Sequence, residues 1–289
     1  MSIIRRSIFL TVMAAAVACA QSTLSVKWEE LTAVDFVKAI GQAQGVCLLP
    51  FGIVEKHGPH LPLGTDLINS RWVAVHGAEQ EYAVVFPEYY FGQIFEARHQ
   101  PGAIAYSARL QLDLLQETAG EMSRNGCKKI VIVNGHGGNN NLLPFFGQAQ
   151  LASPRDYVVY VYNSFTQSPG RPKLKSASDS HAGEGETSDT LISRPDLVHV
   201  DRASSQSGAD LNRLDLPAGV YTPIWWYAKF PNHYGGDGSV ASKELGEFDM
   251  KAAAARVANV IRAVKADQTT PRLQREFYEN SRQPLETKQ

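Results

Sequence analysis

The sequence predicts an α/β fold with a mainly parallel sheet and helices on both of its faces. Apolar segments too short to be helices occur at residues 46–51, 83–87, 129–133 and 157–162, and we interpret each as a buried strand. Amphipathic stretches with helical spacing separate them, and such alternation is typical of parallel strands joined by helices. With 289 residues and 44% hydrophobic content, the chain is large enough for one sizeable core.

The expected helices fill the gaps between these strands. On the third of them, Leu110, Leu114, Thr118 and Met122 are expected to share the buried face. We predict helices at residues 31–42, 67–81, 108–125, from about 142, from the segment near 184 to about 193, and at 242–267; residues 268–289 are expected to form a loose or partner-contacting polar tail.

The first twenty residues resemble an export signal. Arg5 and Arg6 precede an apolar run at residues 8–18, and Ala18-Cys19-Ala20 supplies the small residues of a cleavage site. We therefore expect residues 1–20 to be a signal peptide cleaved near Ala20, and the mature chain to be exported to the periplasm or medium.

Two alternatives for this segment are less favoured. A retained membrane anchor would need roughly 20 apolar residues, more than the run provides. A lipid anchor on Cys19 is disfavoured because Ala16 is a weak residue at the leading position of such a signal. Removing Arg5 and Arg6 with the signal changes the formal net charge from −1 to −3, which argues against a nucleic-acid partner.

The mature chain, residues 21–289, is expected to be one domain with two cysteines, Cys47 and Cys127. Each lies near the start of a predicted buried strand. Export allows a disulfide, but two cysteines make no framework, so buried free thiols are the favoured interpretation.

Three short motifs combine histidines, carboxylates and glycines. They are GIVEKHGPHLPLGTD at residues 52–66, NGHGGN at 134–139 and HAGEGETS at 181–188, and they contain four of the eight histidines. Imidazole and carboxylate groups are the ligands of Zn²⁺, Mn²⁺ and Fe²⁺. The composition therefore predicts a metal site.

The first two motifs begin where predicted strands end, and parallel strands bring such loops to one edge of the sheet. Glu55, His57, Asp66 and His136 are the candidate ligands. Taken singly, a histidine beside glycine is usually a surface residue, and Asp66 fits a helix N-cap. The coincidence of three such loops favours a metal site over these alternatives.

The third motif appears at the start of a predicted helix. His181 and Glu184 are three residues apart and lie near one helical face, whereas Glu186 points elsewhere unless the first turn is irregular. Glu184 also fits a carboxylate that caps the helix N-terminus.

Together the three motifs resemble the creatininase family of creatinine amidohydrolase-like metallohydrolases, over residues 28–268. The resemblance implies a three-layer α/β/α sandwich with two divalent ions, Zn, Mn or Fe. It assigns Glu55 and His136 to one ion and His57 to the other, with Asp66 bridging. The enzyme from which the family takes its name has a ligand glutamate where this chain has Gly138, so Glu186 is the expected substitute at the second ion.

The implied reaction is hydrolysis of an amide C–N bond in a cyclic amide, a formamide or a related small amide. A metal-bound water would attack the carbonyl, and His181 or Glu184 would protonate the leaving nitrogen. Trp225 and Trp226, within the irregular segment 202–234, are the candidate substrate-binding residues. That segment is either a lid over the site or a surface excursion. The resemblance also implies a homo-oligomer, with hexamers known in the family.

Two rival functions remain open. A metal-dependent phosphoesterase would require a basic clamp, for which Arg98, Lys56 and the segment 173–175 are the only candidates. A non-catalytic exported protein that binds metal or ligand is the other, and Gly138 in place of a ligand is the feature that supports it.

Overall fold

The computed structural model describes residues 24–164 and 168–287 and contains a four-stranded parallel sheet. The strands lie in the order β2 (Val84–Val85), β1 (Val46–Phe51), β3 (Lys129–Asn134) and β4 (Val158–Asn163). Every residue of β1 and β3 is buried. The predicted strands and their parallel arrangement are confirmed, and the expected signal peptide lies outside the described residues.

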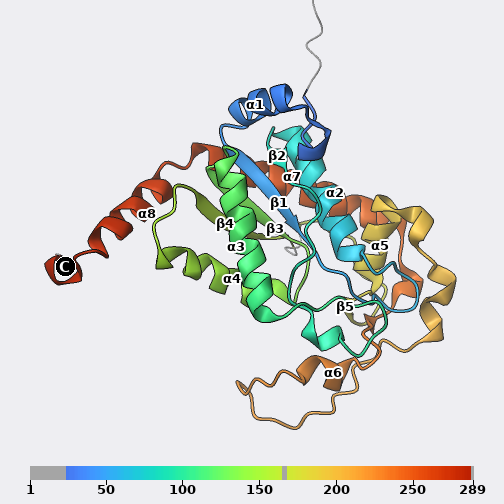
Figure 1. Ribbon diagram of the computed structural model, residues 1–289. Helices are drawn as coiled ribbons and strands as arrows, with labels where there is room; N and C mark the ends of the chain where they lie inside the picture. Colours follow the sequence, from blue (N-terminus) through green and yellow to red (C-terminus); the bar gives the residue numbers. More distant parts are fainter. Residues whose placement is uncertain (1–23, 165–167, 288–289) are drawn as a thin grey trace, which may run out of the picture.

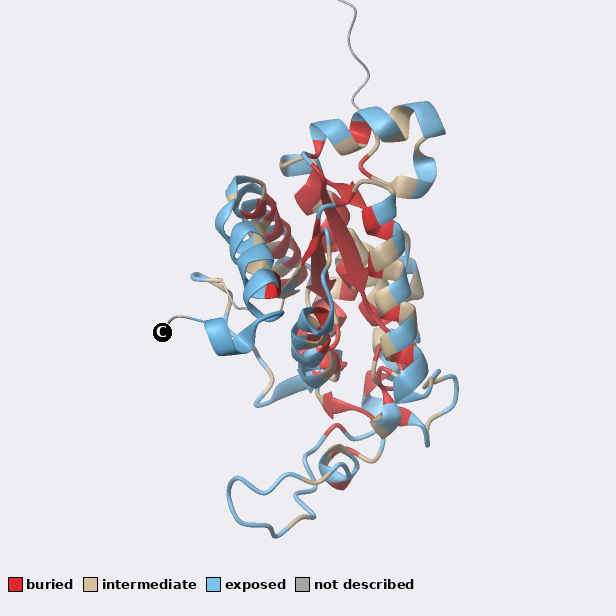
Figure 2. Ribbon diagram, turned by 60° about the vertical axis from the view of Figure 1, so that its left-hand side comes forward, coloured by how far each residue is buried: buried red, intermediate tan, exposed pale blue. Residues whose placement is uncertain are grey.

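Helices cover both faces of the sheet, as Figure 1 shows. Val46 and Leu48 of β1 pack on the side of α2 (Thr65–Gln80) and α7 (Lys243–Ala266), whereas Cys47, Leu49 and Phe51 pack on the opposite side. Successive strand residues thus serve two cores, which is why the strands are continuous apolar runs. The opposite core contains residues of α1 (Ala33–Gln42), α3 (Ala108–Arg124) and α4 (Asn139–Ala149). Figure 2 shows the buried strands between two partly exposed helical layers, which confirms the α/β/α architecture.

Two helical expectations differ from the structure. The buried face of α3 consists of Gln111, Leu115, Ala119, Met122 and Ser123, so the predicted face is rotated by about one residue, and Leu110 is 41% exposed. Part of the expected loose tail forms α8 (Thr269–Asn280), which extends past the sheet edge at β4. An Asp267 oxygen accepts the backbone N–H groups of Thr269 and Thr270, which stabilises the start of the helix. Buried Tyr278 donates to the carbonyl of Gln150, which attaches the helix to the rest of the protein.

The remaining elements gather beyond the carboxyl ends of the strands. A short antiparallel pair, β5 (Asp179–His181) and β6 (Gly235–Gly236), precedes and follows α5 (Glu184–Ser193) and α6 (Trp225–Lys229). α6 lies at the end of a long loop that projects from this edge (Figure 1). The described residues include no helix with the length and apolar character to cross a bilayer.

Cys47 and Cys127 form a disulfide, so the preference for free thiols is wrong. The starts of β1 and β3 are adjacent because Lys128 and Lys129 both donate backbone N–H groups to the carbonyl of Gly45. This places the two cysteine Cα atoms 5.6 Å apart, inside the range that a disulfide spans. Only the pairing of the strands brings the two thiols together.

Loss of this disulfide is expected to lower the free energy of unfolding by about 2–4 kcal/mol, because the bond closes a long loop in the unfolded chain. The two cysteines are 80 residues apart. Urea denaturation of the oxidised protein, the reduced protein and the Cys47→Ala/Cys127→Ala variant measures the effect. The reduced protein keeps both buried thiol groups, so it measures loss of the bond alone, whereas the alanine variant also loses the packing of the sulfur atoms. Equal stability of the reduced and oxidised forms would contradict the expectation.

Candidate functional site

The first motif leaves β1 and returns to the start of α2, which brings its acidic and histidine side chains together. A Cβ on Gly52 would lie 2.5 Å from the backbone nitrogen of Leu67, so only glycine allows this close approach of strand and helix. Asp66 lies in the first turn of α2, and that helix has no side-chain N-cap. Asp66 therefore does not cap the helix, and its carboxylate faces His57 and His136 instead.

Asp66 stands between two histidines. Its Oδ2 lies 2.9 Å from Nδ1 of His136, and its Oδ1 lies 3.1 Å from Nε2 of His57. Glu55 Oε1 lies 3.0 Å from the same nitrogen of His136, and Glu186 Oε1 lies 3.6 Å from Nε2 of His57. The structure thus forms two groups of three donors that share Asp66. These are all five of the predicted metal ligands.

The carboxylate and imidazole atoms of this cluster are arranged as ligands of divalent ions, because direct hydrogen bonds between them leave some of the buried oxygens without a partner. Glu55 Oε1 and Asp66 Oδ2 are buried and have no hydrogen-bond partner, although both lie close to His136. Ligands that share one ion at about 2.0–2.1 Å lie roughly 3.0–3.4 Å apart, near the distances found in both groups. Glu55 and His57 are fully buried, and burial of unpaired polar atoms is costly. The residues present therefore suit a two-ion centre.

The electrostatics of the group depend on acid–histidine pairing. Burial would lower the pKa of His136, but the charge of Glu55 and contact with Asp66 raise it to about 10. Burial opposes the shift at Glu186 too, yet His57 lowers its pKa to about 2. The pKa of His57 is correspondingly raised well above its ordinary value by Glu186 and Asp66, against the effect of burial. Because metal ligands must be unprotonated, binding of divalent ions would release these protons.

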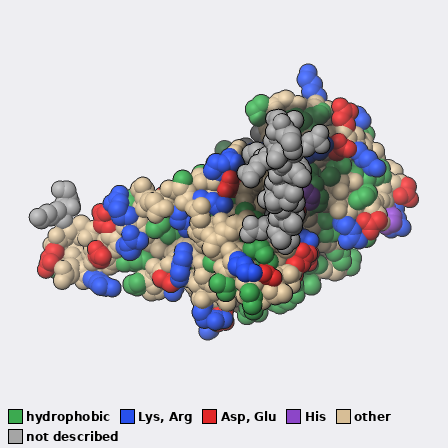
Figure 3. All heavy atoms as spheres, turned by 90° about the horizontal axis from the view of Figure 1, so that it is seen from above, with side chains coloured by type: hydrophobic (Ala, Val, Ile, Leu, Met, Phe, Trp, Pro, Cys, Tyr) green, Lys and Arg blue, Asp and Glu red, His purple; other side chains and the backbone are tan. Residues whose placement is uncertain are grey.

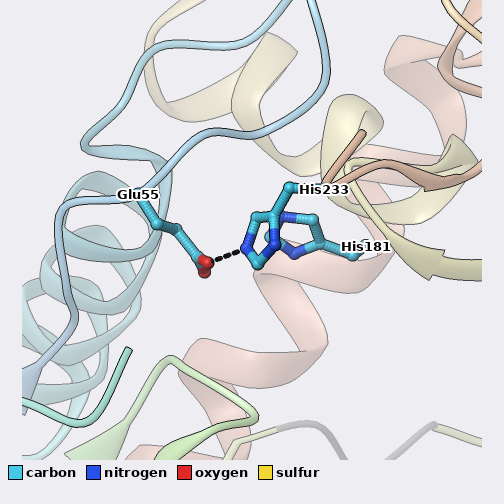
Figure 4. A group of neighbouring side chains, drawn as sticks. All are labelled: Glu55, His181 and His233. Atoms are coloured by element: carbon cyan, nitrogen blue, oxygen red, sulfur yellow. Dashed lines mark hydrogen bonds and ion pairs between the residues drawn. The ribbon is translucent and has the colours of Figure 1, made fainter. Parts of the chain in front are cut away.

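His233 is a functional candidate that sequence reasoning missed. Figure 4 shows it pointing at Glu55, with His181 beside it, and its Nε2 contacts Glu55 Oε2. The indole N–H of Trp226 donates to Nδ1 of His233 at 2.9 Å, so Nδ1 carries the lone pair and the ring is neutral. Burial agrees with this, since it lowers the pKa of His233 to about 4. The only sequence signal was its position beside the aromatic cluster and the glycines at 235 and 236.

His181 reaches the same group from β5. Its ring lies 4.4 Å from that of His57 and 4.6 Å from that of His233, measured between centroids. Nε2 of His181 lies 2.9 Å from the carbonyl of Lys56, which only accepts, so Nε2 carries the hydrogen. Nδ1 then faces Glu186 Oε2 at 3.8 Å. His181 is thus placed to exchange a proton beside the donor cluster.

Glu184 is not brought to this group. Its Oε2 accepts the backbone N–H groups of Lys175 and Ser176, both at 2.7 Å, and the residue is buried away from the cavity-lining side chains. The predicted role of Glu184 as a proton donor is therefore replaced by a structural one. It does not cap its own helix either, since a carboxylate of Asp179 accepts the N–H of Gly185 instead.

A cavity of about 1510 Å³ opens above the donor cluster. Trp225 and Trp226, the candidate substrate-binding residues, line it. The later part of the segment 202–234, between Tyr221 and His233, therefore contributes to the cavity wall, whereas none of residues 202–220 lines the cavity. The other aromatic or apolar side chains that this segment contributes are Tyr221, Pro223, Ile224 and Tyr227.

Fold and site together define a class: an α/β/α protein with a buried, carboxylate-bridged pair of histidine groups at the carboxyl edge of its sheet. The chain belongs to the creatininase family, whose model, described as creatinine amidohydrolase, matches residues 29–261. The creatinine amidohydrolase of Pseudomonas putida is 25% identical over 81% of this chain and 95% of its own.

Other relatives carry different names. The mycofactocin precursor peptide peptidase of Mycolicibacterium smegmatis is 34% identical over 58% of this chain and 65% of its own. A solved structure of creatinine amidohydrolase superposes with a TM-score of 0.71 at 22% identity, covering 85% of this chain and all of the other. At that identity the superposition confirms the fold alone.

Proposed function

We propose that this protein is a metal-dependent hydrolase that cleaves an amide C–N bond with a metal-activated water. The observation that carries the proposal is the sharing of Asp66 by two donor groups beneath the cavity. Two divalent ions held there, of Zn, Mn or Fe type, would supply an activated water and polarise the amide carbonyl. Creatininase structures described with Mn and, for a mutant, in a Zn-Zn type support Mn and Zn as candidates.

The chain's own residues position and protonate the substrate. Glu55 and His136 would hold one ion, His57 and Glu186 the other, and Asp66 both. His181 faces the cavity beside this cluster and is the candidate that delivers a proton to the leaving nitrogen. Because Nε2 donates to the Lys56 carbonyl, Nδ1 is the atom that takes up and delivers this proton.

The substrate class is an amide, and the cavity favours one with a sizeable group next to the scissile bond. A volume of about 1510 Å³ exceeds the roughly 300–1,000 Å³ of common small-ligand sites. Relatives named as creatinine amidohydrolase, peptide peptidase and formylamino pyrimidine deformylase support cyclic amides, peptides and formamides as candidates. A screen of these three classes with the metal-loaded protein tests the proposal directly.

Replacing His136 with Ala is expected to remove one of the two bound ions and to lower kcat/KM by about 10³-fold or more, because several kcal/mol of transition-state stabilisation depend on the metal centre. Elemental analysis and amidase assays on the same preparation measure both effects. A variant that keeps two equivalents of metal would show that the ligand assignment is wrong.

The rivals make different predictions for the same measurements. Among the described residues, Arg98 is the only lysine or arginine that lines the cavity, which gives a phosphoesterase little to clamp a phosphate with. A non-catalytic binding protein remains as the second candidate, supported by Gly138 in place of a family ligand. It predicts fewer than two equivalents of metal after careful loading, and no turnover in the screen.

We also propose that the mature protein is exported and forms a homo-oligomer, with a hexamer as the candidate assembly. The disulfide supports export, because such bonds persist in oxidising compartments. Exposed apolar side chains on and after α8, namely Leu273, Phe277 and Leu285, support association.

Basic and acidic side chains are interspersed on the face in Figure 3, without the single basic patch of a nucleic-acid-binding surface. Fractionation of the native host and light scattering test location and assembly.

A further inference from the structure

His136 has one nitrogen in the donor cluster and one whose partner is missing. Nδ1 faces Glu55 and Asp66, while Nε2, on the far side of the ring, is buried without a hydrogen-bond partner. A histidine that binds metal through one nitrogen carries hydrogen on the other. In most metal sites this N–H donates to a carboxylate or a carbonyl, which holds the ring in place and increases its basicity.

The space beside this nitrogen exists because residue 138 is glycine. A Cβ on Gly138 would overlap Nε2 of His136 and would lie 2.9 Å from Oε1 of Glu96 and 3.0 Å from the carbonyl oxygen of Gln93. The imidazole N–H and the Glu96 carboxylate therefore flank one small space. Any side chain at position 138 would fill it and separate them.

Glu96 is held at this space by contacts of its own segment. The backbone N–H of Gln93 donates to Oδ1 of Asn139 at 2.9 Å, and the side chain of Gln93 donates to the carbonyl of Gly138 at 3.4 Å. These bonds fasten η2 (Phe95–Ala97) to the start of α4. Within residues 24–164 and 168–287, the structure gives the Glu96 carboxylate no hydrogen bond or ion pair. A buried donor and an acceptor without a partner thus stand on either side of Gly138.

We propose that Glu96 is a positioning residue that accepts the Nε2–H of His136 across Gly138 and so holds Nδ1 toward its metal ion. This inference rests on the proposed function only in requiring that His136 binds metal. Glu96 contributes from outside the ligand set, and glycine at position 138 is what allows the contact.

The test is a competition titration of Zn²⁺ and Mn²⁺ against a chromophoric chelator, without substrate. Glu96→Ala is expected to weaken the binding of one of the two ions about 10–100-fold, and Glu96→Gln to fall between Ala and wild type, because its amide oxygen still accepts. Glu88→Ala is the matched control, since Glu88 is exposed in the segment preceding Gln93 and does not line the cavity. Thermal unfolding of the metal-free variants checks that they fold.

Wild-type affinity of Glu96→Ala for both ions would overturn the inference and would leave the Gln93 carbonyl as the acceptor. Equal losses in the Gln and Ala variants would also overturn it. These results differ from a failure of the proposed function, in which the wild-type protein itself binds no divalent ion or binds two and hydrolyses no amide.

Discussion

Replacing Asp66 with Asn is expected to remove both metal ions and to lower kcat/KM by about 10³-fold or more. The two carboxylate oxygens face different histidines, at 2.9 Å from His136 and 3.1 Å from His57. An amide of the same shape offers one oxygen and one NH₂ group, and the latter repels a cation. Elemental analysis, metal titration and amidase assays measure the effect.

The control for this variant is Asp35→Asn, because Asp35 also lies in the first turn of a helix but is half-exposed, pairs with Lys38 and does not line the cavity. It separates loss of metal from a general effect of removing a charge near a helix N-terminus. Two equivalents of metal in Asp66→Asn would rule out the bridging role.

Replacing His181 with Ala is expected to leave the metal content unchanged and to lower kcat by about 10²–10⁴-fold, the usual range for loss of a general acid or base. His181 contacts the cluster through ring packing on His57. Its Nδ1 lies 3.8 Å from Glu186 Oε2, farther than His57 and His136 lie from Asp66, at 3.1 and 2.9 Å. Metal analysis beside steady-state kinetics, with a substrate whose leaving group needs no proton as comparison, measures this role.

His76→Ala is the matched control, since His76 packs on Trp72 in α2 and does not line the cavity. Loss of an ion from His181→Ala would instead make His181 a ligand, which its nearness to Glu55 and Glu186 also allows. In that case the leaving nitrogen would need another proton donor.

The parts of the fold that depend on local patterns could be predicted. The apolar run at residues 46–51 predicts a strand because its length is typical of a buried strand and shorter than most helices, and β1 has those bounds. The five candidate ligands could be identified because they follow strand ends or begin a helix, where neighbouring parallel strands bring their loops to one place. The face of α3 was missed by about one residue, since Leu110 and Leu114 did not reveal that Gln111 would be buried with a hydrogen bond to the Tyr106 carbonyl.

Long-range contacts could not be predicted. His233 meets Glu55 across 178 residues, and its ring orientation depends on Trp226, which a projecting loop carries back to the cluster. Glu184 has the same sequence neighbourhood as Glu186, yet its carboxylate is bound by two backbone N–H groups of the segment that precedes β5. Spacing alone did not distinguish the two.

The sequence by itself determined the α/β class and the chemistry of the donor set, because strand composition and motif content are local properties of the chain. Only the tertiary structure decided which side chains of that set share Asp66, that Cys47 and Cys127 pair, and that Gly138 leaves a space for Glu96. Each of these depends on how separate segments pack against one another, and the local sequence pattern does not specify the distances between such segments.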